Sequence, residues 1–273
     1  MLRQAIIPLA GQGTRLLPLS SILPKELLPI NGKSNLEYIL DECIEAGIKE
    51  FIFIISKKKE SIKKYFFNDQ FYKSILVKKK DKRILQVYKN LKKYQKMIKF
   101  VYQNEPRGTG DAILKCKKYI KSSHFLMLFP DDLIIKKNCS KEMISLHKKT
   151  KGSIIATKTV KKENISRYGV LSFVNKKKNY FQIKDVVEKP SIIDAPSNHA
   201  IIGRYILPKT IMHKLKFLKP GKGGEIHITD AIKQLIQEEE IFYGSIFKGK
   251  YLDCGTLSGY IKSGIEISRE LKK

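Results

Sequence analysis

The chain alternates short apolar runs with segments whose apolar residues recur at helical spacing. The run at 51–55 is too apolar for a half-exposed strand, so we expect a central parallel strand there. Three further runs are expected to be strands of the same sheet: 5–10, 98–102 and 124–129. In an open sheet of this kind, ligands bind beyond the carboxyl ends of the strands.

Residues 34–46 are predicted to form a helix between the first two of these strands. Their apolar side chains repeat at helical spacing, Ser34 and Glu37 form a capping box, and Gly47 is a plausible stop. A strand, a helix and a strand in this order predict a right-handed βαβ unit.

The remaining segments predict more helices and a second group of strands. Residues 68–96 are lysine-rich with weak periodicity and are expected to be a peripheral helical excursion. Further helices are expected at 58–67, 111–120, 210–217, 225–238 and 256–271, and further strands at 153–159, 168–174, 180–187 and 200–207. No linker rich in Gly, Ser or Pro divides the chain and no repeat is visible. The prediction is therefore one α/β domain spanning 1–273, with a mixed, mostly parallel, Rossmann-like central sheet flanked by helices, and a smaller second lobe.

The composition narrows the classes of function. The net charge of +28 invites a nucleic-acid partner, but the excess is mostly lysine spread along the chain, which favours a solvated basic surface. Only seven arginines are present. Four of them lie in glycine-containing motifs, and we hypothesise that these positions need the planar, forked guanidinium: Arg15, Arg107, Arg167 and Arg204.

The pattern of apolar residues also constrains the cellular location of the protein. No apolar run approaches transmembrane length and no signal-peptide pattern opens the chain, so we expect a cytoplasmic protein without a membrane partner. The four cysteines show no CxxC pairing and are expected to be reduced thiols. Two of them, Cys43 and Cys116, fall on apolar helix faces and are expected in the core.

A glycine turn follows the first predicted strand. It reads Gly11-Gln12-Gly13-Thr14-Arg15 and is followed by Pro24-Lys25-Glu26-Leu27-Leu28-Pro29. Glycines let the backbone approach a ligand, and successive N–H groups can point at oxyanions. Arg15 would add a forked cation and Lys25 a point charge. The turn is neither a P-loop nor a dinucleotide fingerprint, and taken alone it is equally compatible with an ordinary tight turn.

Other polar residues follow strands as well. Gln103 and Asp131 lie at strand ends, so one crevice can collect them together with the glycine turn. Asp131 is a candidate ligand for a hard cation such as Mg²⁺, with a turn or helix cap as the alternative. Asp253 is a second candidate, since it also follows a strand-like run and precedes a glycine.

Glu188 and Lys189 place an acid and a base directly after a predicted strand. The carboxylate could accept hydrogen bonds from hydroxyl groups of a ligand and the lysine could meet a phosphate, or the two could form a surface ion pair worth little. Pro190 is expected to keep Lys189 extended, so that the two side chains diverge. Glycine-rich and strand positions around Gly169, and from Asn198 to Arg204, are further candidates to line the same pocket.

Taken together, these blocks resemble the sugar-1-phosphate nucleotidylyltransferase family. The family opens with Gly-x-Gly-Thr-Arg-Leu followed by Pro-Lys-x-Leu-Leu-Pro. Within the family the chain is most similar to the bacterial-type UTP–glucose-1-phosphate uridylyltransferase branch. The matching blocks run through nearly the whole chain in family order: Phe129-Pro130-Asp131-Asp132, Val187-Glu188-Lys189-Pro190, Ala195-Pro196-Ser197-Asn198, Ile202-Gly203-Arg204-Tyr205, Gly223 to Ile232 and Asp253-Cys254-Gly255.

The resemblance implies a fold, a reaction and a set of residue roles. The fold is that of nucleotidyltransferases and A-type glycosyltransferases, with residues 1–150 as the nucleotide-binding half and 151–273 as the sugar-binding half. The reaction joins UTP and glucose 1-phosphate to give UDP-glucose and pyrophosphate, with Mg²⁺ as cofactor, in a homo-oligomer (dimer or tetramer). The implied roles are nucleotide binding by Ala10, Gly11, Gly13, Gln103 and Gly108, catalysis by Arg15, Lys25 and Lys189, sugar-phosphate binding by Gly169, Glu188 and Lys189, and metal binding by Asp131 and Asp253.

Two positions depart from the family pattern. Asp111 stands where the family usually has histidine, and His227 stands where glutamine is usual. The alternatives are a related nucleotidylyltransferase acting on another base or sugar, such as a thymidylyltransferase, or a non-catalytic paralogue that binds sugar nucleotide, or nucleic acid through its charge.

Overall fold

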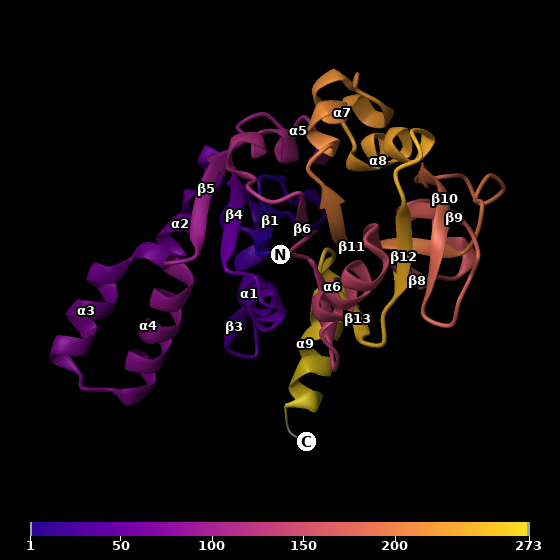
Figure 1. Cartoon of the computed structure of the whole chain (residues 1–273). Coiled ribbons are helices and arrows are strands. Elements are labelled where there is room, and N and C mark those ends of the chain that lie inside the picture. Colours follow the sequence, from indigo (N-terminus) through magenta and orange to yellow (C-terminus); the bar gives the residue numbers. More distant parts are fainter. Residues whose placement is uncertain (1, 272–273) are drawn as a thin grey trace.

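The structure is a computed structural model and describes residues 2–271. These residues form a nine-stranded sheet in the order β5-β4-β1-β6-β11-β8-β12-β10-β9, with helices packed around it (Figure 1). The strands of the first half are parallel, whereas most pairings in the second half are antiparallel. The predicted mixed α/β sheet is therefore present, with its parallel pairings mainly in the first half and one more, between β8 and β12, in the second.

The four strands of the first half lie where the apolar runs predict them. They are β1 Gln4–Pro8, β4 Glu50–Ile55, β5 Ile98–Tyr102 and β6 His124–Leu128. The side chains of Phe51 to Ile55 are fully buried, as expected of a central strand covered on both faces.

Helix α1 (Asn35–Glu45) shows how strongly local sequence fixes an element. Ser34 and Glu37 form the predicted capping box at its start. At its end Gly47 has φ +95°. The N–H groups of Gly47 and Ile48 donate to the carbonyls of Ile44 and Cys43, which is the Schellman pattern that a glycine permits.

The lysine-rich excursion is helical and peripheral, as predicted. Helix α3 (Asp69–Lys78) and helix α4 (Lys82–Gln95) form a hairpin that extends away from the sheet (Figure 1). It is reached from β4 through η4 Lys57–Lys59 and α2 Glu60–Phe67. The helix predicted at 111–120 is shorter: α5 spans Thr109–Leu114 and a 3-10 turn, η5 Lys117–Tyr119, follows it.

In the second half β11 (His199–Pro208) holds the sheet together. It lies antiparallel between β6 of the first half and β8 of the second, so the sheet is continuous across both. The other predicted strands are β8 Ser153–Thr159, β9 Gly169–Val174 and β10 Tyr180–Glu188, and the predicted helices are α7 Ile211–Phe217, α8 Ile228–Gln237 and α9 Leu257–Glu270.

Several elements were not anticipated from the sequence. Strand β7 (Asp132–Ile135) pairs antiparallel with β13 (Lys250–Asp253) in a two-stranded ribbon. The other unpredicted elements are β2 Pro29–Ile30, β3 Lys33–Ser34, α6 Cys139–Thr150 and β12 Phe242–Ile246, and the short 3-10 turns η1 Thr14–Leu16, η2 Leu19–Ser21, η3 Lys25–Leu27, η6 Lys162–Arg167 and η7 Lys222–Gly224.

The core consists of two apolar clusters. Cys43 lies in one and Cys116 in the other, both fully buried as predicted, and all four cysteines are free. In the part of the chain that the structure describes, none of the helices has the length and apolarity to cross a bilayer.

Candidate active site

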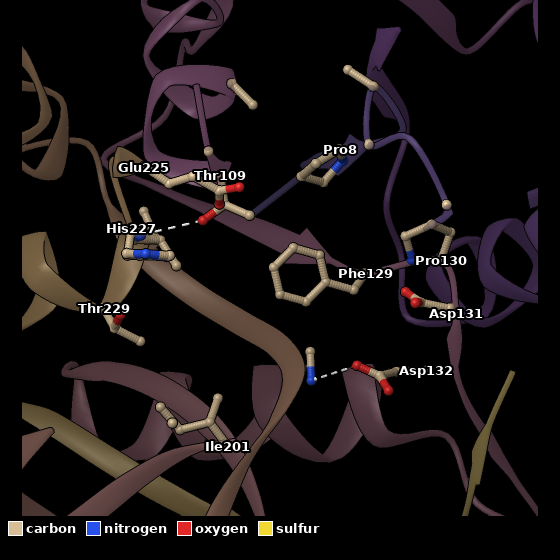
Figure 2. A pocket seen from close by; sticks show the side chains of 18 of the residues that line it. Pro8, Thr109, Phe129, Pro130, Asp131, Asp132, Ile201, Glu225, His227 and Thr229 are labelled. Carbon is tan, nitrogen blue, oxygen red and sulfur yellow. Dashed lines mark hydrogen bonds between the residues drawn. The ribbon is translucent and has the colours of Figure 1, made fainter. Parts of the chain in front are cut away.

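A cavity of about 580 Å³ lies beyond the carboxyl ends of the parallel strands. Its lining includes the residues to which the resemblance assigns a catalytic, binding or metal role: Ala10, Gly11, Gly13, Arg15, Lys25, Gln103, Gly108, Asp131, Gly169, Glu188, Lys189 and Asp253. Figure 2 shows Thr109, Glu225 and His227 on one side of this cavity and Asp131 on the other, with Phe129 between them. Residues far apart in the sequence therefore line one pocket.

The glycine turn forms one wall. Gly13 adopts φ +70°, a left-handed conformation that side-chain-bearing residues rarely tolerate, and its carbonyl accepts a hydrogen bond of 2.8 Å from the Ser20 hydroxyl. A Cβ added at Gly11 would meet nothing within 4 Å, so that position borders open space in the cavity. The turn therefore needs glycine at position 13 for its shape and offers backbone to the cavity at position 11.

Lys25 and Asp131 form the central charge pair of the cavity. The Lys25 Nζ lies 2.7 Å from Asp131 Oδ2, and both side chains are mostly buried. Burial by itself would lower the pKa of Lys25, but the charges of Asp131 and Glu26 outweigh it and hold that pKa above its usual value. Burial would raise the pKa of Asp131, yet neighbouring Lys25 brings it below the usual value. Both groups are therefore charged at neutral pH.

Arg15 supplies a second cation to the same carboxylate. Its Nη2 lies 3.5 Å from Asp131 Oδ2, and its side chain is 58% exposed. Lys25 is thus fixed, whereas Arg15 reaches Asp131 from the solvent side. This end of the cavity therefore offers two cations beside the Asp131 carboxylate, and such cations are suited to binding phosphate groups.

Asp253 approaches Asp131 from the unpredicted β7–β13 ribbon. A Cβ built on Gly255 would lie 2.8 Å from Asp131 Oδ2 and 3.1 Å from Asp253 Oδ1, so both carboxylates border one point. Asp253 Oδ2 also lies 3.5 Å from Arg167 Nη2. Arg15 Nη2 lies 2.9 Å from the same point, so a hard cation that shares its shell with phosphate and water fits between these oxygens only where the 58% exposed Arg15 moves aside. Within residues 2–271, no group of three or more His, Cys, Asp or Glu side chains forms a metal-binding cluster.

Asp132 and Tyr251 line the cavity but were missed in the sequence. Asp132 accepts hydrogen bonds from the Tyr251 hydroxyl at 2.5 Å and from the Gly203 N–H at 3.1 Å, the latter drawn in Figure 2. Burial, followed by the charge of Asp131, raises the pKa of Asp132 to about 6. Tyr251 could have been found, because alternation along a strand places it on the same face as Asp253.

The opposite end of the cavity is built around Gln103 and the start of α5. Gln103 is 6% exposed, and its Nε2 donates to the Gly108 carbonyl at 3.1 Å and to Asp111 Oδ2 at 2.8 Å. Gly108 adopts φ +96°, and a Cβ there would lie 2.6 Å from the Ile226 carbonyl oxygen. Only glycine fits this close approach between the α5 loop and the loop before α8.

Glu188 and Lys189 lie at the end of β10, where they were expected, but the predicted divergence is wrong. The Lys189 Nζ lies 3.5 Å from Glu188 Oε1, so the side chains converge. Lys189 has φ +44° instead of an extended conformation, and its N–H donates to the Tyr168 carbonyl at 3.1 Å. The following proline disfavours only the right-handed helical region, and this hydrogen bond holds the turn in the left-handed one.

Two further residues, Gly169 and Thr229, complete this wall. Gly169 faces Glu188, because a Cβ there would lie 3.3 Å from Glu188 Oε2. Thr229, from α8, donates to the same Oε2 at 3.0 Å. Residues from β9, β10 and α8 therefore meet at one carboxylate.

Arg204 does not line the pocket, contrary to the sequence interpretation. Strand alternation turns Ile201, Gly203 and Tyr205 toward the cavity and Arg204 toward the other face of the sheet. Arg204 is fully buried there, with Nη2 2.9 Å from Glu42 Oε2 and Nε 3.3 Å from each Glu42 oxygen. Its guanidinium is used as a fork, as hypothesised, but within the core. Arg107 pairs with Glu105 at the surface.

Comparisons with known proteins show the family to which the chain is similar. A family described as "Nucleotidyl transferase" matches residues 4–270. The UTP–glucose-1-phosphate uridylyltransferase of Mycoplasma pneumoniae is 35% identical over 267 residues, covering 97% of this chain and 91% of the relative. The enzyme of the same name from Bacillus subtilis is 34% identical over 275 residues, covering 99% and 92%. A crystal structure of UDP-glucose pyrophosphorylase complexed with UDP-glucose is 35% identical, covers 99% of this chain and 100% of its own, and superposes with a TM-score of 0.87. The fold class expected from the sequence is thereby confirmed.

Proposed function

The chain belongs to the nucleotidyl transferase family, and from that premise we propose that it transfers a uridylyl group from UTP to glucose 1-phosphate, giving UDP-glucose and pyrophosphate. The observation that carries this proposal is the single cavity with the cations Lys25 and Arg15 at one end and the neutral amide of Gln103 at the other. A nucleoside triphosphate has the same polarity, with its charge at one end and its base at the other.

The reaction needs no protein nucleophile. An oxygen of the sugar phosphate attacks the α-phosphorus of UTP, the new phosphorus–oxygen bond forms, and the bond to the β-phosphate oxygen breaks as pyrophosphate leaves. Lys25 and Arg15 neutralise the charge that builds on the phosphate oxygens, and the cavity holds the two substrates in line. The raised pKa of Lys25 keeps its ammonium protonated for this task.

The residue roles follow the division of the cavity. Ala10, Gly11, Gly13, Gln103 and Gly108, all from the half spanning 1–150, hold the nucleotide. Gly169, Glu188 and Lys189, from the half spanning 151–273, hold the sugar phosphate, with the Glu188 carboxylate accepting sugar hydroxyls and the Lys189 ammonium meeting the phosphate.

We assign Mg²⁺ as the cofactor and Asp131 with Asp253 as its protein ligands. The two carboxylates border one space beside Gly255, and carboxylate oxygen is a preferred ligand of this ion. When bound, the ion would neutralise phosphate charge. Chelation should abolish turnover and added Mg²⁺ should restore it, whereas unchanged turnover in excess chelator would contradict the assignment.

We also propose that the chain works as a homo-oligomer. Helix α9 exposes Leu257, Ile261 and Ile265, which recur every four residues and so share one face. An apolar face of this kind is suited to burial against a second copy. Sedimentation velocity over a range of protein concentrations tests this, and a monomer at all concentrations would contradict it.

Pyrophosphate release tests the reaction itself. The purified protein is assayed with each nucleoside triphosphate against a panel of sugar 1-phosphates, with Mg²⁺ present. The expected result is the highest kcat/KM with UTP and glucose 1-phosphate. Preference for another base or sugar would identify a different member of the family, and no release with any pair would indicate a binding protein without catalysis.

A further inference from the structure

The side-chain amide of Gln103 is held in one orientation by the protein. Its Nε2 carries two N–H bonds, and the two acceptors that it reaches are the Gly108 carbonyl at 3.1 Å and Asp111 Oδ2 at 2.8 Å. Among the described residues no donor reaches its Oε1, and that atom remains accessible in a residue that lines the cavity. The amide therefore presents an acceptor to the cavity and keeps both of its donors behind it.

Asp111, together with the Gly108 carbonyl, favours one orientation of the Gln103 amide over the other. It lies on α5 and is 8% exposed, and its other oxygen, Oδ1, is 3.4 Å from Lys115 Nζ. A carboxylate can only accept hydrogen bonds. If the Gln103 amide turned over, its oxygen would face the Asp111 carboxylate and the Gly108 carbonyl, and two hydrogen bonds would become two contacts between acceptors.

We propose that Asp111 is a positioning residue that selects the base of the nucleotide through Gln103. This inference rests on the proposed function, in which the neutral end of the cavity holds the base. The Oε1 acceptor requires an N–H on the edge of the base that faces it. Uracil and thymine offer their imide N3–H, whereas cytosine offers a bare N3 lone pair at the same place. The site therefore accepts uracil or thymine and rejects cytosine, without distinguishing the C5 methyl group.

The test compares UTP with CTP in the wild-type protein and in Asp111→Asn. Asparagine keeps the shape, but it can donate as well as accept, so only the Gly108 carbonyl still opposes turning over of the Gln103 amide. The preference for UTP over CTP in kcat/KM should fall about tenfold, the usual effect of one hydrogen bond of this kind. Asp111→Leu, which provides no acceptor, should lower the preference at least as far. A general loss of structure affects both nucleotides alike and leaves their ratio unchanged.

The chain offers a matched control. Asp69 accepts from Gln95 Nε2 at 2.8 Å and from Lys92 Nζ at 2.8 Å, the same Gln–Asp–Lys arrangement outside the cavity. Asp69→Asn should therefore keep the full preference for UTP.

Binding of UTP and CTP in the absence of sugar phosphate, followed by isothermal titration calorimetry, separates this inference from the proposed function. If the wild-type protein prefers UTP in binding and Asp111→Asn loses that preference, the inference holds even where no sugar nucleotide is formed. If UTP and glucose 1-phosphate are turned over and both Asp111 variants keep the wild-type ratio, the inference is overturned and the function stands. Equal binding of UTP and CTP by the wild-type protein also overturns it.

Discussion

The position of the Lys25 side chain in the cavity predicts a catalytic role for this residue. Its ammonium is almost fully buried, 2.7 Å from Asp131, on the phosphate side of the cavity. Lys25→Ala should lower kcat about a hundredfold, because loss of one such transition-state contact typically costs about 3 kcal/mol. The melting temperature should change far less in proportion. Steady-state kinetics with UTP and glucose 1-phosphate measure the effect.

Lys33 provides the comparison for Lys25. It forms an exposed ion pair with Asp41 at 2.8 Å, outside the cavity, and such pairs contribute little to stability. Lys33→Ala should leave kcat unchanged. Wild-type kinetics from folded Lys25→Ala would refute the role of the buried lysine.

Glu188 belongs to sugar recognition in the proposed function. Its carboxylate accepts from Thr229 at 3.0 Å and lies 3.5 Å from the Lys189 ammonium. Glu188→Ala should weaken glucose 1-phosphate binding by about 1.5–3 kcal/mol, the usual cost of losing a charged acceptor, while UTP binding without sugar is kept. Isothermal titration of each ligand decides this. An equal loss of UTP affinity would place Glu188 in the nucleotide site or in the fold.

One buried ion pair joins three secondary-structure elements, β11, α1 and α6. Arg204 from β11 binds Glu42 from α1, and Glu42 also accepts from the backbone and hydroxyl of Ser140 in α6. The Arg204 Nη1 further donates to the Phe129 carbonyl at 3.2 Å, just before Asp131. The pair therefore supports the loop that carries the cavity carboxylates.

Removing one partner of this pair should be costly. Arg204→Met leaves the Glu42 charge buried without its partner, and we expect a loss of about 3–5 kcal/mol in the free energy of unfolding. The double variant Arg204→Met with Glu42→Leu should recover much of that loss, because no charge then remains buried. Urea unfolding of the single and double variants measures both values. A double variant no more stable than Arg204→Met would show that the pair is not the source of the loss.

The folded protein should lose stability on mild acidification, because His124, which lies beside His147, resists protonation in the folded state. The rings of His124 and His147 lie 4.6 Å apart, and burial, followed by the charge of His147, lowers the pKa of His124 to about 4. In the unfolded chain this pKa is about 6.5. Above that value both states are neutral. As the pH falls from about 6.5 to 4, only the unfolded chain takes up the proton, so stability falls across that window.

The His124→Gln variant isolates this contribution. Between pH 7 and pH 4, the free energy of unfolding of this variant should fall by about 1–2 kcal/mol less than that of the wild-type protein. This figure allows for solvent screening of the partly exposed His124 ring. His213, which is exposed on α7, is the control, and His213→Gln should follow the wild-type curve. Parallel curves for His124→Gln and the wild type would rule out the histidine pair.

Elements whose signals are local could be predicted from the amino-acid sequence alone. The apolar run at 51–55 and the capping box and glycine of α1 fixed a strand and a helix, because burial on both faces and satisfied helix ends depend on neighbouring residues alone. The residues expected from glycine turns and from polar positions after strands lie around one cavity, because the carboxyl ends of neighbouring strands meet there, and their roles stay a prediction. Asp132 and Tyr251 were missed, and Arg204 lies in the core instead.

Contacts between segments that are far apart in the chain could be established only from the tertiary structure. The antiparallel return of β11 between β6 and β8 turned Arg204 into the core, and a one-residue shift in register would have reversed that choice. The β7–β13 ribbon brought Asp253 to Asp131, and a hydrogen bond to Tyr168 held Lys189 in a left-handed turn. These outcomes depend on pairing between strands far apart in the chain, which no local window of residues contains.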